Sequence, residues 1–149
     1  METIHTADAV RVTWDSDPVK GGAVAVGRDR IGAVGKLDDV REAFPRARVR
    51  RWPGTLGPAR VHEGPLPDAP SPRERVHEVL KLGAVAVLEE YVDSPELRSA
   101  AERNDVVVLP SARRTAAIVP TGRADLAVFD EAGECVATVC AGRLVHRRR

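Results

Sequence analysis

The sequence predicts an α+β fold, with β-structure at both ends of the chain and a small α/β insert between them. The first and last thirds contain short apolar runs separated by turn residues, a pattern typical of strands and hairpins. The middle contains two Ser-Pro helix starts, each followed by a short apolar run. A connector over residues 53–72 holds six of the 11 prolines. We therefore assign residues 1–57 and 118–149 to one domain, and residues 58–117 to the connector and a truncated α/β insert.

The composition is that of an ordinary globular protein: 43% of the 149 residues are hydrophobic and 30% are charged. The net charge of +1 gives no reason to expect nucleic acid or an anionic membrane as a partner. No signal peptide is recognisable, and no apolar run approaches the ~18 residues of a membrane span, so we expect a cytoplasmic protein. Cys135 and Cys140 lie five residues apart in one predicted strand, which places them on opposite faces and argues against a disulfide.

The first third is predicted as strands and one short helix. Residues 4–12 form a strand, residues 23–34 a hairpin and residues 37–45 the helix. Residues 47–52 alternate apolar and basic side chains, as a half-buried strand does, and Pro53-Gly54 is expected to end that strand.

The middle is predicted as α-β-α-β. Residues 71–83 begin with a serine cap, a proline at the first helical position and a glutamate three residues after the cap. Residues 94–104 begin with the same Ser-Pro pair. Each helix precedes a short apolar run, residues 84–89 and 105–110, as expected of buried parallel strands.

The last third returns to β-structure. Residues 124–130 read as a strand, and residues 134–147 as a hairpin with Ala141-Gly142 at its tip. The terminal arginines are interpreted as a solvated tail, and the excess of Arg over Lys as a coding bias.

Four stretches near the two ends of the chain are distinctive: GGAVAVGRDRIGAVG (21–35), VRRWPGTLGP (49–58), GRADLAVFD (122–130) and VATVCAGRLVHRR (136–148). They resemble the terminal segments of the metal-dependent amidohydrolase superfamily, especially its imidazolonepropionase and aminodeoxyfutalosine-deaminase-like members. In those enzymes the N- and C-terminal segments meet in a β-sandwich beside a catalytic (β/α)8 barrel. The resemblance therefore implies a composite β-sandwich built from the two end segments of this chain.

The same resemblance implies that the catalytic barrel is missing. In the family, the metal is bound through a His-x-His motif that follows a proline. Pro58 stands at the position of that proline. Gly64 and Leu66 stand where the two histidines belong, and neither is a metal ligand. A (β/α)8 barrel needs roughly 200 residues, whereas only residues 67–117 remain for it. We therefore expect no metal or other cofactor. His62 and Glu63 are weak candidates for displaced metal ligands, against the simpler interpretation as loop residues.

Polar residues follow the two predicted parallel strands of the insert, where ligands bind in open α/β sheets. They would suit a small polar molecule, although strand ends and helix caps are polar in most α/β units. These candidate ligand-binding residues are Glu89, Glu90, Tyr91, Asp93, Ser111, Arg113 and Arg114.

Two functions remain open, and we favour the first. The chain is either a non-catalytic amidohydrolase-like remnant that acts as a binding or assembly module, or a hydrolase of non-peptide C–N bonds with a rebuilt site. Two parallel strands cannot bury their own faces and edges. A homodimer through the insert is therefore expected, with another partner protein as the alternative.

Overall fold

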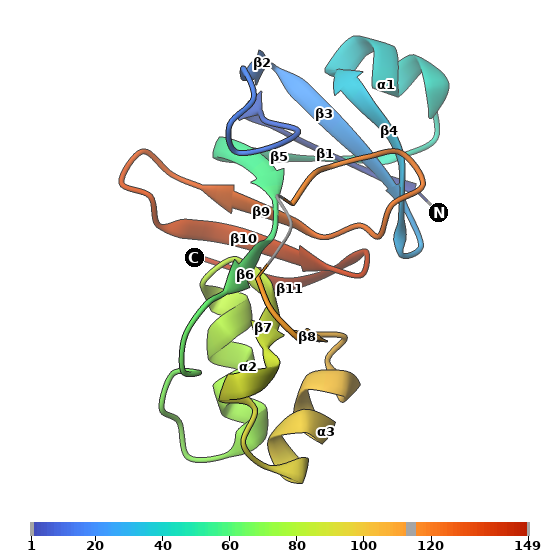
Figure 1. The fold of residues 1–149 in the computed structure, drawn as a ribbon. Helices are drawn as coiled ribbons and strands as arrows, with labels where there is room; N and C mark the ends of the chain where they lie inside the picture. The colour runs from blue at the N-terminus through green and yellow to red at the C-terminus, as the bar shows by residue number, and fades with distance from the viewer. Residues whose placement is uncertain (1, 113–115, 149) are drawn as a thin grey trace.

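The computed structural model describes residues 2–112 and 116–148, which form a large sheet and a smaller α/β insert (Figure 1). The predicted mixed α/β character is confirmed. The large sheet contains β1 (Glu2–Val10), β2 (Val19–Lys20), β3 (Gly22–Gly27), β4 (Arg30–Lys36), β5 (Arg48–Pro58), β9 (Leu126–Phe129), β10 (Cys135–Cys140) and β11 (Arg143–Arg147). The insert contains β6 (Arg60–His62), α2 (Pro72–Lys81), β7 (Ala84–Leu88), the 3₁₀ turn η1 (Glu89–Tyr91), α3 (Pro95–Arg103) and β8 (Val107–Leu109).

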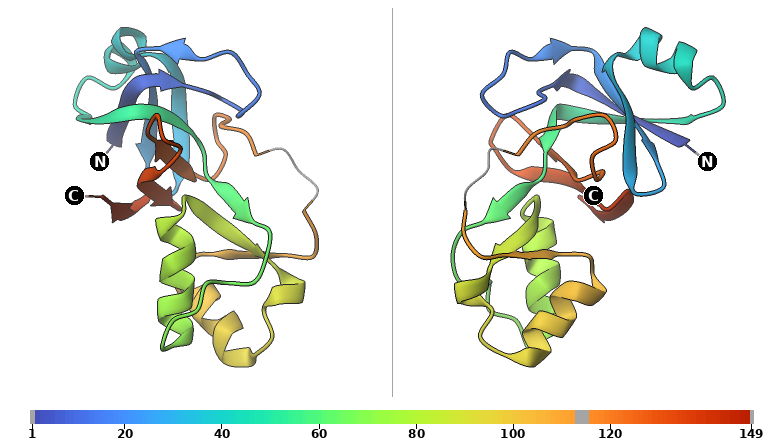
Figure 2. Two further views of the ribbon diagram at one scale, coloured as in Figure 1. Left: turned by 90° about the vertical axis from the view of Figure 1, so that its left-hand side faces the viewer. Right: turned by 45° about the vertical axis from the view of Figure 1, so that its right-hand side comes forward.

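The large sheet joins both ends of the chain in the order β11-β10-β9-β5-β1-β3-β4, with β2 beside β1. β1 and β5 pair in parallel, and the other neighbours pair antiparallel. Helix α1 (Leu37–Ala43) covers one face, where Val40 packs on Ile4 and Ala25. β1 begins and β11 ends on the same side of the molecule (Figure 2, left).

The two halves of this sheet curl over a shared core. Val24 and Ile31 from the N-terminal half belong to the same buried cluster as Val136 and Val139 from the C-terminal half. The segment 121–124 links the edge strand β4 to the tip of the β10–β11 hairpin. It exchanges backbone hydrogen bonds with Ile31 of β4, and the Ala124 carbonyl accepts a hydrogen bond from the Gly142 N–H at the hairpin tip. The sheet is thus one continuous hydrogen-bonded path, and its division into the two layers of a sandwich stays a prediction.

The prediction that Pro53-Gly54 ends the strand is wrong, because β5 continues to Pro58. Gly54 adopts a positive φ of 96°, and its N–H turns to donate to Asp8 Oδ2 at 2.9 Å. A bulge in β5, where Pro53 and Gly54 stand opposite the single residue Asp8 of β1, absorbs the irregularity. Beyond this point β5 gains β9 as a neighbour, so a single strand connects the two halves of the sheet.

The helices of the insert begin as predicted. Ser71 Oγ accepts a hydrogen bond from the Glu74 N–H at 3.2 Å, and Ser94 Oγ accepts one from the Leu97 N–H at 3.1 Å. The parallel sheet has three strands, not two, because β6 lies in the predicted connector and pairs with β7. The described helices are too short and too polar to cross a membrane.

The insert packs as a separate lobe on the outer face of β9 and β10 (Figures 1 and 2). Thr138 of β10 donates a hydrogen bond to the Leu80 carbonyl at 2.7 Å, and Phe129 lies in the core of the insert. Both cysteines are free and both contact this core, so their assignment to opposite faces is wrong. A bulge between Cys135 and Ala137 shifts the alternation of the strand by one residue.

Candidate functional site

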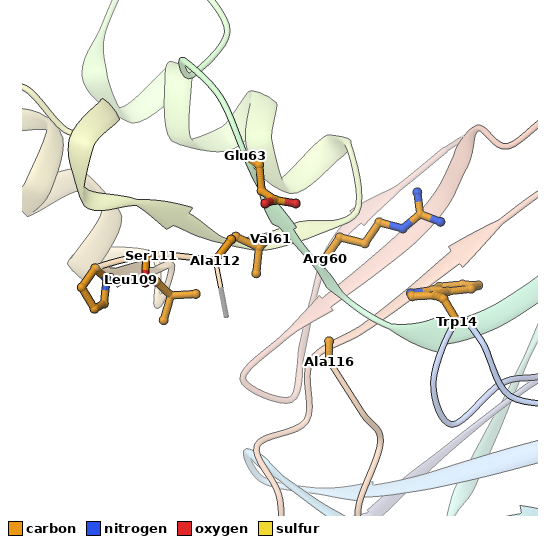
Figure 3. A pocket seen from close by; sticks show the side chains of 9 residues that line it. Trp14, Arg60, Val61, Glu63, Leu109, Ser111, Ala112 and Ala116 are labelled. Atoms are coloured by element: carbon orange, nitrogen blue, oxygen red, sulfur yellow. The ribbon is translucent and has the colours of Figure 1, made fainter. Parts of the chain in front are cut away.

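A cleft of about 560 Å³ lies where the insert meets the loop between β1 and β2. The carboxyl ends of β6 and β8 open into it, which is the usual position for ligands in parallel sheets. Figure 3 shows Trp14 and Arg60 on one side, Leu109 and Ser111 on the other, and Glu63 between them. The cleft is lined by Trp14, Arg60, Val61, Glu63, Leu109, Pro110, Ser111, Ala112 and Ala116.

One wall of the cleft is an aromatic and cationic stack. Trp14 Nε1 donates to the Pro58 carbonyl at 2.8 Å, and the Trp14 ring meets the Phe129 ring edge-on at a centroid distance of 5.4 Å. The Arg60 guanidinium lies 4.9 Å from the Trp14 ring centre and 4.2 Å from that of Phe129. These contacts fix a positive charge beside an apolar wall.

The remaining polar groups of the cleft come from the ends of β6 and β8. Glu63 is the one carboxylate among the described residues that line it. Ser111 Oγ is buried and has no hydrogen-bond partner in the described part of the chain. One carboxylate, one hydroxyl and one guanidinium can orient a small ligand, but neither a histidine nor a thiol is present among these residues to act as nucleophile or base.

The predicted ligand-binding residues are only partly brought together. Ser111 lines the cleft, whereas the residues from Glu89 to Asp93 do not. Glu89 forms an exposed ion pair with Arg98 of α3 at 3.2 Å, which directs it toward the helices. Glu90 and Asp93 are exposed, and Tyr91 packs against the core of the insert. Arg113 and Arg114 lie outside the described residues.

The candidate metal ligands do not form a metal site. His62 Nε2 lies 2.9 Å from the Pro65 carbonyl oxygen, and Glu63 faces the cleft. Leu66, at a position where the family would have a histidine, is buried in the core of the insert. Within residues 2–112 and 116–148, no three His, Cys, Asp or Glu side chains gather closely enough to bind a metal ion. The donor set therefore does not fit the metal that the resemblance implies.

The two cysteines are equally unsuited to catalysis. Burial raises the pKa of the Cys140 thiol to about 11, although the charge of Arg123 opposes this rise. Burial also raises the pKa of Cys135. At neutral pH both side chains are protonated thiols, which are poor nucleophiles.

Sequence reasoning missed Trp14 and Arg60. Trp14 follows the strand predicted for residues 4–12 and was assigned to no element, although a large aromatic residue there was an available signal. It is held against Gly57, where any Cβ atom would overlap its ring. Arg60 stands in the segment interpreted as an irregular connector, and its partners are remote in sequence.

Comparison with known proteins identifies the fold. No family model matches the chain, and no curated protein matches it. Solved structures do match. Guanine deaminase from E. coli shares 13% identity with a TM-score of 0.55, over 72% of this chain and 35% of that enzyme. Guanine deaminase from Bradyrhizobium japonicum shares 14% with a TM-score of 0.53, over 80% and 38%.

Helicobacter pylori aminofutalosine deaminase gives 14% identity and a TM-score of 0.52, over 72% of this chain and 32% of that enzyme. The chain thus spans about a third of the length of the structures that it matches. The chain therefore has the fold of part of these deaminases.

Proposed function

We propose that this chain is a non-catalytic, amidohydrolase-like module that assembles through its insert. Residues 1–57 and 118–149 would form the composite β-sandwich domain, and the truncated insert would supply the interface. The observation that supports this proposal is the free edge of the insert sheet. The described lining of the cleft holds a single carboxylate, and the apolar face that runs from Val61 and Leu109 in the cleft to Val107 ends at this edge.

The apolar face lies opposite the two helices. Val85 and Val87 of β7 pack against α2 and α3. The alternate residue Ala86 points the other way, beside its register partners Val61 and Val107. Val107 remains 37% exposed, one of the few large apolar side chains in the described residues that do so. In the described part of the chain, β8 has β7 as its one partner strand.

A second copy of the chain would pair with the free edge of β8. Two β8 strands related by a twofold axis would pair antiparallel, giving a six-stranded sheet with a continuous apolar face. We expect sedimentation equilibrium of the whole chain to give a dimer. Val107→Lys places like charges at the twofold contact and is expected to give monomers.

Leu82→Lys is the matched control. Leu82 is 50% exposed at the end of α2 and is not part of the β8 edge strand, so this variant is expected to remain dimeric. A monomeric wild type, or equal dissociation of both variants, would show that the insert edge does not mediate self-assembly. In that case another protein partner replaces the second copy in the proposal.

The alternative function is a hydrolase of non-peptide C–N bonds with a rebuilt site, which the position of Glu63 in the cleft favours. Measuring the metal content of the purified protein by elemental analysis distinguishes the hydrolase from the non-catalytic module. For a non-catalytic module we expect metal well below one equivalent per chain, also after incubation with zinc, iron or manganese salts. Binding near one equivalent, abolished by Glu63→Gln but retained by Glu74→Gln on exposed α2, would instead support the hydrolase.

A further inference from the structure

Basic side chains gather on the inner face of β5, remote from the cleft. Arg48, Arg50 and Trp52 alternate along this strand and therefore share one face. In the parallel register with β1, Arg50 is the partner of His5, and Trp52 is the partner of Ala7. The opposite face of β5 carries Val49, which packs under α1.

A third guanidinium reaches this face from the other end of the chain. Arg147 of β11 lies over the Trp52 ring, with its guanidinium carbon 5.8 Å from the ring centre. Within the described residues, Arg48, Arg50 and Arg147 form no ion pair with a carboxylate, whereas Arg98, Arg143 and Arg148 each do.

The three charges disfavour one another. Burial lowers the pKa of Arg50, and the positive charges of Arg48 and Arg147 lower it further. Like charges held together on one surface reduce stability unless a negative charge joins them. The cluster is therefore a surface that an anion would stabilise.

His5 adds a neutral donor to the same surface. Trp52 Nε1 lies 3.1 Å from His5 Nδ1, and an indole nitrogen can only donate a hydrogen bond. His5 Nδ1 is thus the acceptor, and the neutral ring carries its proton on Nε2. Nε2 has no hydrogen-bond partner in the described part of the chain, and it keeps some contact with solvent although His5 as a whole is only 3% exposed. All the free polar groups here are donors.

We propose that Arg48, Arg50, Arg147 and the Nε2–H of His5 form a binding site for a small oxyanion with two or more negative charges, such as a phosphate group. Guanidinium groups recognise the oxygens of such anions through paired charge-assisted hydrogen bonds. The cluster joins three strands from both ends of the chain. Occupancy of this site would therefore tie the β1–β5 pair to β11.

A small anion fits this surface better than a nucleic acid. The cluster holds only three guanidiniums, two on β5 and one on β11, which is too few to follow an extended polyanion. Trp52 is only 7% exposed, so it offers no face on which a base could stack. The net charge of +1 adds no long-range attraction for a polyanion.

The site can be tested by titrating the ¹⁵N-labelled full chain with pyrophosphate and following its two indole N–H signals. The Trp52 signal is expected to shift and saturate, while that of Trp14 serves as an internal reference. Arg50→Gln is expected to weaken binding at least about tenfold, because it removes a charge-assisted hydrogen bond. Since it also relieves repulsion, this variant should be no less stable than the wild type without pyrophosphate.

Arg41→Gln is the control, since it removes an equal charge from exposed α1 on the other face. Equal weakening in both variants, or no saturable shift of Trp52, would overturn the proposal. Short single-stranded oligonucleotides provide a further comparison. If their affinity rises with length and exceeds that for pyrophosphate, the surface binds nucleic acid and the small-anion site is wrong.

Discussion

Replacing Gly142 by Ala is expected to lower the free energy of unfolding by about 2–4 kcal/mol. Gly142 lies at the tip of the β10–β11 hairpin with a φ of +81°, a region that costs a side-chain-bearing residue strain. An added Cβ would also overlap the carbonyl oxygen of Arg28 in the β3–β4 turn. The hairpin tip would have to move away, and the hydrogen bond from its N–H to the Ala124 carbonyl, now 2.9 Å, would be lost.

Urea denaturation of Gly142→Ala and Gly133→Ala, compared with each other, separates the cost of the positive φ from the cost of the steric overlap. Gly133, in the turn between β9 and β10, has nearly the same φ of +80°, but nothing lies within 4 Å of its added Cβ. Gly133→Ala should therefore lose only about 1 kcal/mol, the cost of the left-handed conformation. Equal losses in the two variants would mean that contact between the two hairpins contributes nothing to stability.

These contacts explain why some of the fold was predictable and some was not. The helices α2 and α3 begin where the Ser-Pro pairs predict, because a cap depends on residues only three positions apart. The β10–β11 hairpin has its tip at Ala141-Gly142 as predicted, for the same local reason. The curl of the large sheet depends instead on contacts such as that between Arg28 and Gly142, which no local pattern encodes.

Bulges caused the two errors about strands. Cys135 and Cys140 were predicted on opposite faces because side chains alternate along a regular strand. The bulge at the start of β10 adds one residue, so the two cysteines lie on the same face. Likewise, the Pro53-Gly54 pair resembles a strand end, yet Asp8 binds the Gly54 N–H and the strand continues. In the second case a residue on another segment determined the outcome.

The cleft lies near the strand ends at which ligands were expected, and whether it binds one stays a prediction. Ligands were expected at the carboxyl ends of the insert strands, and the cleft opens there beside Ser111 and Glu63. Its other wall comes from Trp14, in a loop of the large sheet, and no pattern within the insert could have predicted this.

The arginine cluster was missed because the alternation of Arg48 and Arg50 indicated only a strand. Arg147 was interpreted as part of a solvated tail. In the structure it pairs with Ala137 of β10, and its guanidinium lies over the Trp52 ring.

Lowering the pH from 6.5 to about 4 is expected to cost the wild type about 3 kcal/mol of unfolding free energy through His5 alone. Burial, aided by the charge of Arg50, lowers the pKa of His5 from 6.5 to about 4. Between these values the unfolded chain binds the proton and the folded chain does not. Protons therefore favour unfolding throughout this window, and the effect levels off below pH 4. Above pH 6.5 His5 is neutral in both states and contributes no pH dependence.

His5→Gln is expected to remove this dependence, because its amide oxygen can still accept the Trp52 N–H while the residue cannot be protonated. Urea denaturation of both proteins at several pH values between 4 and 7 measures the difference. Burial lowers the pKa of His146 as well, so His5→Gln should retain a shallower loss of the same sign. Parallel curves for the two proteins would mean that His5 takes up its proton in the folded state as readily as in the unfolded chain. The imidazole would then carry a proton on both nitrogens, and Nδ1 could no longer accept from Trp52. The hydrogen bond between Trp52 and His5 therefore depends on the same pKa that the denaturation curves measure.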